Sequence, residues 1–161
     1  MGRIVTPSEI VQAAMELRDI GRTIVFTNGC FDLLHLGHVR YLQQAKELGD
    51  VLVVGLNSDT SASAIKGADR PLVPEEARAE VLTALDCVDY VVIFSQPTAR
   101  ELVELLKPEV YVKGGDYSSV ELLPEAPAVA SYGGRVVLLP YVPGYSTTDL
   151  IDKIVRLHAS S

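Results

Sequence analysis

The chain has 161 residues, of which 48% are hydrophobic and 22% charged, a composition typical of one soluble globular domain. Its formal net charge of −7 argues against general nucleic-acid binding, which needs a basic face. No apolar run is long enough to span a membrane, the first residues lack the apolar core of a signal peptide, and two cysteines are too few for a disulfide framework. We therefore expect a cytoplasmic protein with neither a membrane nor a nucleic acid as partner.

Segments with helical and with strand-like patterns alternate along the chain. The first helix is predicted to begin at Thr6, which forms a capping box with Glu9, and to end at Gly21. Short apolar runs then predict buried strands, and a polar loop is expected from Asn57 to Val73. The expected strands are 23–26, 51–56, 90–94, 110–112 and 136–139, and the later helices are 37–48, one opened by Pro74, 98–106 and one starting near Thr147.

This alternation predicts a doubly wound (Rossmann-like) α/β fold. We expect a five-stranded parallel sheet with helices on both faces, in a single domain of residues 1–161 with the N-terminal helix (1–21) packed on it. Ligands of such sheets bind at the carboxyl ends of the strands, where the strand order reverses. The functional residues are therefore expected within 28–38, 57–70, 113–117 and 141–148.

Two of the three histidines, His35 and His38, lie three residues apart at the predicted entry to a helix. This spacing points both imidazoles the same way, beside backbone N–H groups that favour an anion. Such donors could stabilise the charge on a phosphorus under in-line attack. Two other interpretations remain open: the histidines could simply satisfy the helix end, or, with Asp32, they could bind zinc. A dinucleotide cofactor is disfavoured because the G-x-G-x-x-G spacing is absent.

The segment 29–38, GCFDLLHLGH, resembles the H-x-G-H signature of the cytidylyltransferase-like nucleotidyltransferase superfamily. The segment 145–148, YSTT, resembles the second signature of that superfamily, at the start of the final helix. The wider match is to the adenylyltransferase domain of the bifunctional heptose kinase/adenylyltransferases, and it extends over nearly the whole chain in the right order. It includes residues 27–32, 66–67 with 70–71, 112–117 and 144–148.

The resemblance implies transfer of AMP from ATP to a sugar 1-phosphate, D-glycero-D-manno-heptose 1-phosphate, in lipopolysaccharide or other surface-sugar biosynthesis. It also implies Mg²⁺ held by the nucleotide phosphates without direct protein ligands, and a homodimer. Matching positions imply a catalytic set of His35, His38, Lys46, Ser146 and Thr147. They imply a nucleotide-binding set of Asn28, Gly29, Phe31, Asp32, Gly37, Arg78, Lys113, Gly115, Asp116 and Thr148, and an acceptor-binding set of Asn57, Lys66 and Arg70.

The sequence departs from the family in two places. Nothing precedes the N-terminal helix, so we expect a stand-alone transferase without the kinase domain of the bifunctional homologues. Tyr145 stands where the heptose family commonly has cysteine, and Tyr141-Val142-Pro143 replaces an Arg-Thr pair of the glycerol-phosphate and ethanolamine-phosphate cytidylyltransferases. The absence of that Arg-Thr pair favours the heptose-phosphate branch, with ATP, over the cytidylyltransferase branch, with CTP and glycerol 3-phosphate. A nucleotide-binding module without catalysis is the alternative from another class.

Overall fold

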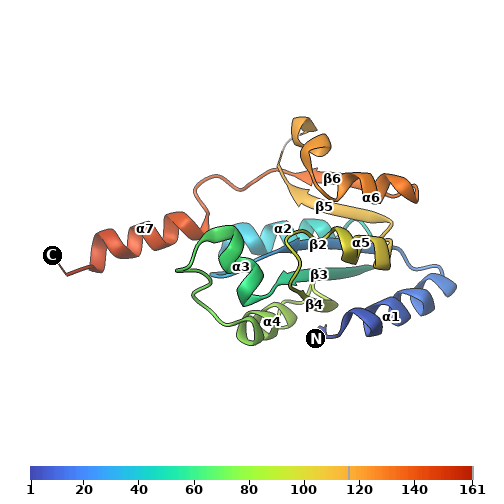
Figure 1. Ribbon diagram of the computed structural model, residues 1–161, viewed down its shortest axis with the longest axis horizontal. Coiled ribbons are helices and arrows are strands. Elements are labelled where there is room, and N and C mark those ends of the chain that lie inside the picture. Colours follow the sequence, from blue (N-terminus) through green and yellow to red (C-terminus); the bar gives the residue numbers. More distant parts are fainter. Residues whose placement is uncertain (116, 161) are drawn as a thin grey trace.

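The computed structural model describes residues 1–115 and 117–160. Over these residues six parallel strands form one sheet, in the order β1-β4-β3-β2-β5-β6 (Figure 1). Their bounds are β1 (Arg3–Ile4), β2 (Ile24–Gly29), β3 (Val51–Asn57), β4 (Tyr90–Phe94), β5 (Val110–Gly114) and β6 (Arg135–Leu139). The expected doubly wound α/β fold is confirmed, with one strand more than expected. The additional strand is β1, in which two residues, too few to show a pattern, pair with Tyr90 and Val91 at the sheet edge.

The described helices are α1 (Pro7–Asp19), α2 (Leu36–Lys46), α3 (Asp59–Lys66), α4 (Glu75–Thr83), α5 (Arg100–Leu106), α6 (Ala126–Ser131) and α7 (Thr147–His158), with a 3₁₀ segment at Tyr117–Leu122. The predicted capping box at the start of α1 is confirmed, with Thr6 and Glu9 bonded reciprocally at 3.2 Å. The polar loop expected from Asn57 to Val73 is wrong over α3. This helix begins at Asp59 because the Ser58 side chain accepts a hydrogen bond from the Ser61 N–H. Its residues are mostly small or polar, so the sequence shows no apolar periodicity there.

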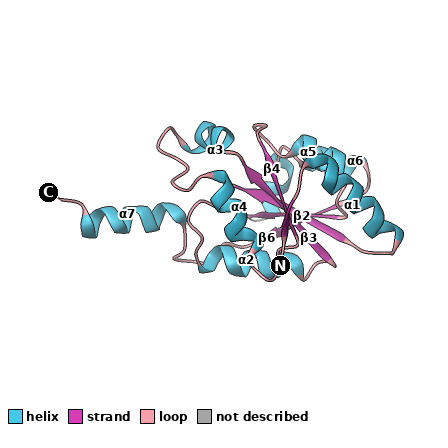
Figure 2. Ribbon diagram, turned by 90° about the horizontal axis from the view of Figure 1, so that it is seen from below, coloured by secondary structure: helices cyan, strands magenta, loops and turns pink. Residues whose placement is uncertain are grey.

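Helices cover both faces of the sheet, as Figure 2 shows. On one face, α1, α5 and α6 bury residues such as Ile10 and Val103 against Phe26 and Tyr111 of the strands. On the other face, α2 and α4 bury Leu42 and Leu82 with neighbouring strand residues. The two apolar clusters fix the strands as a rigid platform, and the loops at its edge carry the functional side chains.

The order of the strands reverses between β2 and β5. From β2 the chain proceeds through β3 to β4 on one side and then returns to β5 and β6 on the other side. Asn28 and Gly29 at the end of β2 therefore lie near Lys113 and Gly114 at the end of β5. This is the topological switch point at which parallel α/β sheets bind ligands.

The last helix, α7, differs from the others because none of its side chains is buried. Figures 1 and 2 show it extending away from the sheet, with its first turn next to the loop that joins α3 and α4. Among the described residues, no helix combines the length and apolar character needed to cross a membrane.

Candidate active site

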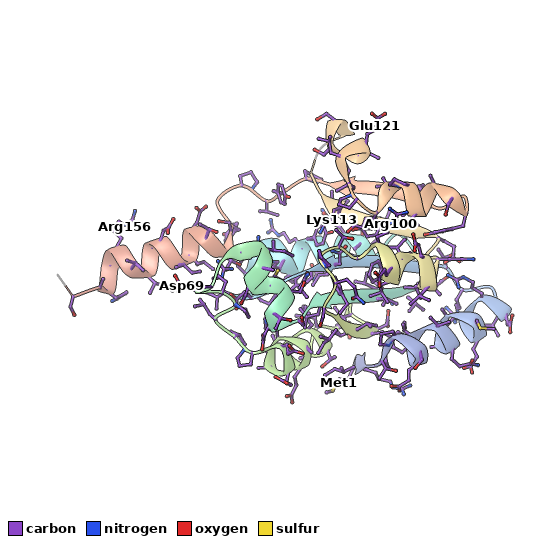
Figure 3. All side chains as sticks on the ribbon, in the orientation of Figure 1. Met1, Asp69, Arg100, Lys113, Glu121 and Arg156 are labelled. Carbon is purple, nitrogen blue, oxygen red and sulfur yellow. The ribbon has the colours of Figure 1, made fainter. Side chains whose placement is uncertain are left out.

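A cavity of about 330 Å³ opens at the carboxyl edge of the sheet, where β2 and β5 end. Its volume is in the range of small-molecule sites. Lys113, one of its lining residues, lies near the middle of the molecule in Figure 3. The structure brings most of the predicted site residues to this cavity: Asn28, Gly29, Phe31, Asp32, His35, Gly37, His38, Lys66, Arg70, Lys113, Ser146, Thr147 and Thr148.

The two histidines are adjacent at the start of α2. His35 is the residue before the helix, with extended backbone angles, and its ring centroid lies 3.9 Å from that of His38. The Nδ1 of His38 accepts a hydrogen bond from the His35 backbone N–H at 3.4 Å. Because Nδ1 is the acceptor, the proton of neutral His38 belongs on Nε2, which is then a hydrogen-bond donor. A Cβ on Gly37 would approach the His35 ring to 2.8 Å, so glycine is needed for this arrangement.

Both histidines are neutral at neutral pH. Burial lowers the pKa of His35, and burial together with the neighbouring His35 lowers the pKa of His38 to about 4. A neutral imidazole keeps one N–H for a phosphate oxygen. The charge that a triphosphate brings would in turn favour protonation, which would add positive charge where the transition state becomes more negative.

The lowered pKa of His38 predicts a pH dependence of stability. Between the ordinary histidine pKa of about 6.5 and the folded value of about 4, the unfolded chain binds more protons than the folded one. The free energy of unfolding should therefore fall as the pH drops through this interval. Denaturant unfolding of wild type and His38→Gln over a pH series measures the effect. We expect a steeper loss for wild type, and parallel curves would contradict the assignment.

The start of α7 also lines the cavity, beside the loop that carries the histidines. Ser146 precedes the helix and accepts a hydrogen bond from the Asp149 N–H at 2.9 Å, while the Thr147 hydroxyl donates to the Leu33 carbonyl at 3.1 Å. The N–H groups of Thr147 and Thr148 belong to the first helical turn, which lacks partners within its own helix. The bond to Leu33 ties this group of donors to the loop that carries the histidines, 114 residues earlier in the chain. Together they form a pocket suited to an anion.

Asp32 and Arg70 join the histidine loop to the segment between α3 and α4. Asp32 is almost fully buried, and it accepts hydrogen bonds from Arg70 Nε at 2.9 Å and from the Leu72 and Val73 N–H groups. Burial alone would raise the pKa of Asp32, but these donors outweigh it and the pKa is lowered. Asp32 is thus an ionised anchor that fixes the guanidinium of Arg70 at the cavity wall.

Lys113 and Asn28 form the floor of the cavity. The Lys113 ammonium donates to the Asn28 carbonyl at 3.1 Å, and the buried Tyr111 hydroxyl bonds the Asn28 side chain. Burial lowers the pKa of Lys113, which the carboxylate of Glu125 partly opposes. With Lys66 and Arg70, this lysine provides local positive charge in a chain that is acidic overall.

Four of the predicted site residues, Lys46, Arg78, Asn57 and Gly115, do not line this cavity. Lys46 bonds Asp89 at 2.5 Å and the Asp50 carbonyl at 2.7 Å. Both partners precede strands, so Lys46 lies at the edge of the sheet opposite the cavity.

Arg78 is 1% exposed and donates to the carbonyls of Val73, Cys30 and Asn57 and to Asp59, so it is a structural arginine and does not line the cavity. Asn57 is buried and donates to Ser61, and it also lies outside the cavity lining. The backbone N–H of Gly115 bonds the Leu139 carbonyl, and this residue does not line the cavity either. Asp116 lies outside the described residues.

Six residues that the sequence reasoning did not select also line the cavity: Cys30, Tyr41, Gly114, Pro140, Tyr141 and Tyr145. Tyr41 follows His38 by one helical turn, a spacing that could have revealed it; its hydroxyl bonds Thr27 at 2.7 Å and the Val112 carbonyl at 3.1 Å. The ring of Tyr145 lies 6.3 Å from that of His35, with an angle of 27° between the planes. Tyr141 and Tyr145 give the cavity an aromatic wall beside its anion-binding groups.

Zinc binding by Asp32, His35 and His38 finds no support. Within 1–115 and 117–160, no group of three or more histidine, cysteine, aspartate or glutamate side chains is arranged to hold a metal. Asp32 already accepts hydrogen bonds from Arg70, Leu72 and Val73. The remaining donors, which are imidazoles, ammonium groups, hydroxyls and backbone N–H groups, suit an anionic phosphate better than a cation.

A doubly wound sheet with imidazoles, lysines and a helix start around a cavity at its switch point is typical of α/β proteins of the nucleotide-binding class. Residues 26–153 match the family described as cytidylyltransferase-like. The chain belongs to the cytidylyltransferase-like family.

Curated relatives extend the match along the chain. A bifunctional protein HldE from Geobacter metallireducens is 59% identical over 86% of this chain and 28% of its own length. One from Geotalea uraniireducens is 58% identical over 83% of this chain and 27% of its own length. The chain thus spans less than a third of the length of these relatives. A solved structure, the lipopolysaccharide core biosynthesis protein from Thermoplasma volcanium, has a TM-score of 0.62 at 28% identity and covers 76% of this chain and 98% of its own.

Proposed function

We propose that this chain transfers AMP from ATP to D-glycero-D-manno-heptose 1-phosphate in the cytoplasm and releases pyrophosphate. The observation that carries the proposal is the convergence of His35, His38 and the start of α7 on one cavity, with Thr147 bonded to the histidine loop. Relatives named bifunctional protein HldE, at 49–59% identity, support the heptose-phosphate branch of the family. A homodimer belongs to the same proposal.

The reaction needs no covalent intermediate on the protein. A phosphate oxygen of the acceptor attacks the α-phosphorus of the nucleotide, a new P–O bond forms, and the bond to the leaving pyrophosphate breaks on the opposite side. The N–H donors of His35, His38 and the α7 start hold the negatively charged oxygens, while Lys66 and Arg70, which line the same cavity, hold the acceptor phosphate. Catalysis then consists of positioning and electrostatic stabilisation.

Magnesium enters this proposal with the nucleotide. The donor set of the cavity suits phosphate oxygens, so we place the ion on the triphosphate and assign it no protein ligands. When bound there, Mg²⁺ would neutralise part of the charge on the phosphates.

Pyrophosphate release with paired substrates tests the proposed function. ATP, CTP and GTP are each combined with heptose 1-phosphate or with glycerol 3-phosphate, and nucleotide binding is measured in parallel by calorimetry. We expect release only with ATP and heptose 1-phosphate. Release only with CTP and glycerol 3-phosphate would replace our substrate assignment with that of a cytidylyltransferase. Tight nucleotide binding with no release from any pair would indicate a non-catalytic module.

A further inference from the structure

Glu125 is a buried carboxylate that the proposed mechanism does not use. It is 3% exposed and lies directly before α6. Its Oε1 accepts a hydrogen bond from the Ala99 N–H at 3.1 Å, whereas its Oε2 has no hydrogen-bond partner among residues 1–115 and 117–160. A buried carboxylate oxygen without a donor is costly, so we expect a donor close to Oε2.

Glu125 lies next to the hydroxyl of Tyr111, which is fully buried. Burial raises the pKa of Tyr111, and the charge of Glu125 and hydrogen bonding between the two side chains raise it further. The structure directs the single proton of this hydroxyl to Asn28 Oδ1. The Asn28 amide oxygen and the Glu125 carboxylate therefore compete for one proton.

A turn of the Asn28 amide by 180° removes this competition. The amide oxygen and nitrogen exchange places with almost no change in shape, and the correct orientation is the one that satisfies the hydrogen-bond network. After the turn, Asn28 Nδ2 donates to the Tyr111 oxygen, and the Tyr111 hydroxyl donates to Glu125 Oε2. Each of these three side chains then has a partner, which matters most for buried groups.

The turned amide changes the chemistry at the floor of the cavity. Asn28 lines the cavity, so the amide atom that does not meet Tyr111 is the one available to a ligand. That atom is then the acceptor Oδ1. The Lys113 ammonium, which donates to the Asn28 carbonyl at 3.1 Å, lies beside Asn28 as a donor. A hydroxyl accepts one hydrogen bond and donates another, so it matches this pair, whereas a phosphate oxygen needs donors only.

We propose that Glu125 is a positioning residue that acts through Tyr111 to turn the Asn28 amide oxygen toward the cavity. There the oxygen and the Lys113 ammonium bind a sugar hydroxyl. This hydroxyl belongs either to the ribose of the nucleotide or to the acceptor sugar, and this part of the inference rests on the proposed function. The floor of the cavity then selects a hydroxyl, while the histidines and the start of α7 bind the phosphates.

Neutron diffraction from crystals of the perdeuterated wild-type chain tests the amide orientation without any substrate. We expect deuterons on the Asn28 amide atom that contacts Tyr111, and the Tyr111 deuteron directed at Glu125. Deuterons on the amide atom that faces the cavity, or a deuteron on Glu125 Oε2, would overturn the proposal. A chain without turnover in any substrate pair would reject the proposed function, but the neutron result would still decide the orientation of the amide.

Glu125→Gln should reverse the Asn28 amide while keeping the size of the side chain at 125. The Ala99 N–H needs the one oxygen that glutamine retains, so the new amide nitrogen faces Tyr111 and donates to its oxygen. The Tyr111 proton then goes to Asn28 Oδ1, and the Asn28 nitrogen faces the cavity. A ligand hydroxyl in this variant meets two donors and no acceptor.

Calorimetric binding of deoxy analogues measures the loss of this acceptor. ATP is compared with 2′-deoxy-ATP and 3′-deoxy-ATP for the ribose. Heptose 1-phosphate is compared with its monodeoxy analogues for the acceptor, in the presence of a non-cleavable ATP analogue. In wild type we expect removal of one hydroxyl to weaken binding about 3–10-fold, and in Glu125→Gln less than about 2-fold. The ratio within each pair cancels the effect of the lost negative charge on phosphate binding.

Glu121→Gln is the matched control, because it makes the same change in charge at an exposed position of the 3₁₀ segment, at the edge of the molecule in Figure 3. It should keep the wild-type ratios. Tyr111→Phe removes the hydroxyl that joins Glu125 to Asn28, and it should reduce the discrimination as Glu125→Gln does. Circular dichroism checks that the variants are folded.

Two results of the binding experiment would overturn the hydroxyl site. One is a wild-type chain in which no hydroxyl removal costs more than about 2-fold. The other is a Glu125→Gln variant that is folded and keeps the full wild-type cost. Where the cost appears, in the ATP series or in the acceptor series, identifies the sugar that the floor of the cavity binds.

Discussion

His38→Ala should lower turnover about 10²–10³-fold, the effect of removing one donor from a site that stabilises transition-state charge. The hydrogen bond from the His35 N–H orients the His38 ring, and its Nε2 proton is the donor that the alanine variant loses. His35→Ala should show a loss of similar size, because the rings are 3.9 Å apart and line the same cavity. Steady-state pyrophosphate release with ATP and the acceptor measures both variants.

The third histidine of the chain provides the control. His158 lies at the exposed end of α7, far along the helix from the cavity, and His158→Ala should keep turnover near the wild-type value. If His35→Ala or His38→Ala also kept near wild-type turnover, the catalytic role of that histidine would be wrong. Because the two donors act on the same group, we expect the double variant to lose less than the product of the single losses.

Arg78→Met should destabilise the fold by about 3 kcal/mol, without a specific loss of nucleotide affinity in the fraction that stays folded. The guanidinium is 1% exposed and donates to three carbonyls, those of Val73, Cys30 and Asn57. Methionine fills much of the space but leaves these buried acceptors without their donor. For a domain of this size we expect a fall in Tm of about 6–12 °C, measured by calorimetry or circular dichroism.

Arg40→Met is the matched control for this prediction, because Arg40 is exposed on α2. It should change Tm by less than about 2 °C, as surface substitutions usually do. If Arg78→Met kept its stability but lost nucleotide binding, the original assignment of Arg78 to the nucleotide would be restored.

The parts of the fold that could be predicted from sequence are those whose signal is local. The capping box of Thr6 and Glu9 depends only on residues three apart, and 51–56 is apolar throughout because it is buried on both faces of the sheet. The two-residue strand β1 is defined by its pairing with β4, and a pairing between segments so far apart in the chain cannot be predicted from a local sequence pattern. Likewise α3 consists largely of small polar residues, and it is held by its Ser58 cap rather than by an apolar stripe.

The residues of the candidate site also fall into those that could be predicted from sequence and those that could not. The histidine pair and the Ser-Thr-Thr segment could be predicted because a short motif places their donors together and the fold brings both motifs to one edge of the sheet. The roles of single basic residues could not be predicted, because the sequence does not show which group a lysine or arginine contacts in the fold. Lys46 bonds Asp89, and Arg78 bonds carbonyls from segments 21 and 48 residues away. Their contacts are long-range, so only the folded chain shows that they are structural.

A crystal structure with an ATP analogue that resists cleavage between its α- and β-phosphates tests the central claim most directly. The account predicts the triphosphate in the cavity, with imidazole nitrogens of His35 and His38 and the N–H groups of Thr147 and Thr148 within about 3.2 Å of its oxygens. A nucleotide whose phosphates contact neither the histidines nor the start of α7, or only one of these two groups, would contradict it.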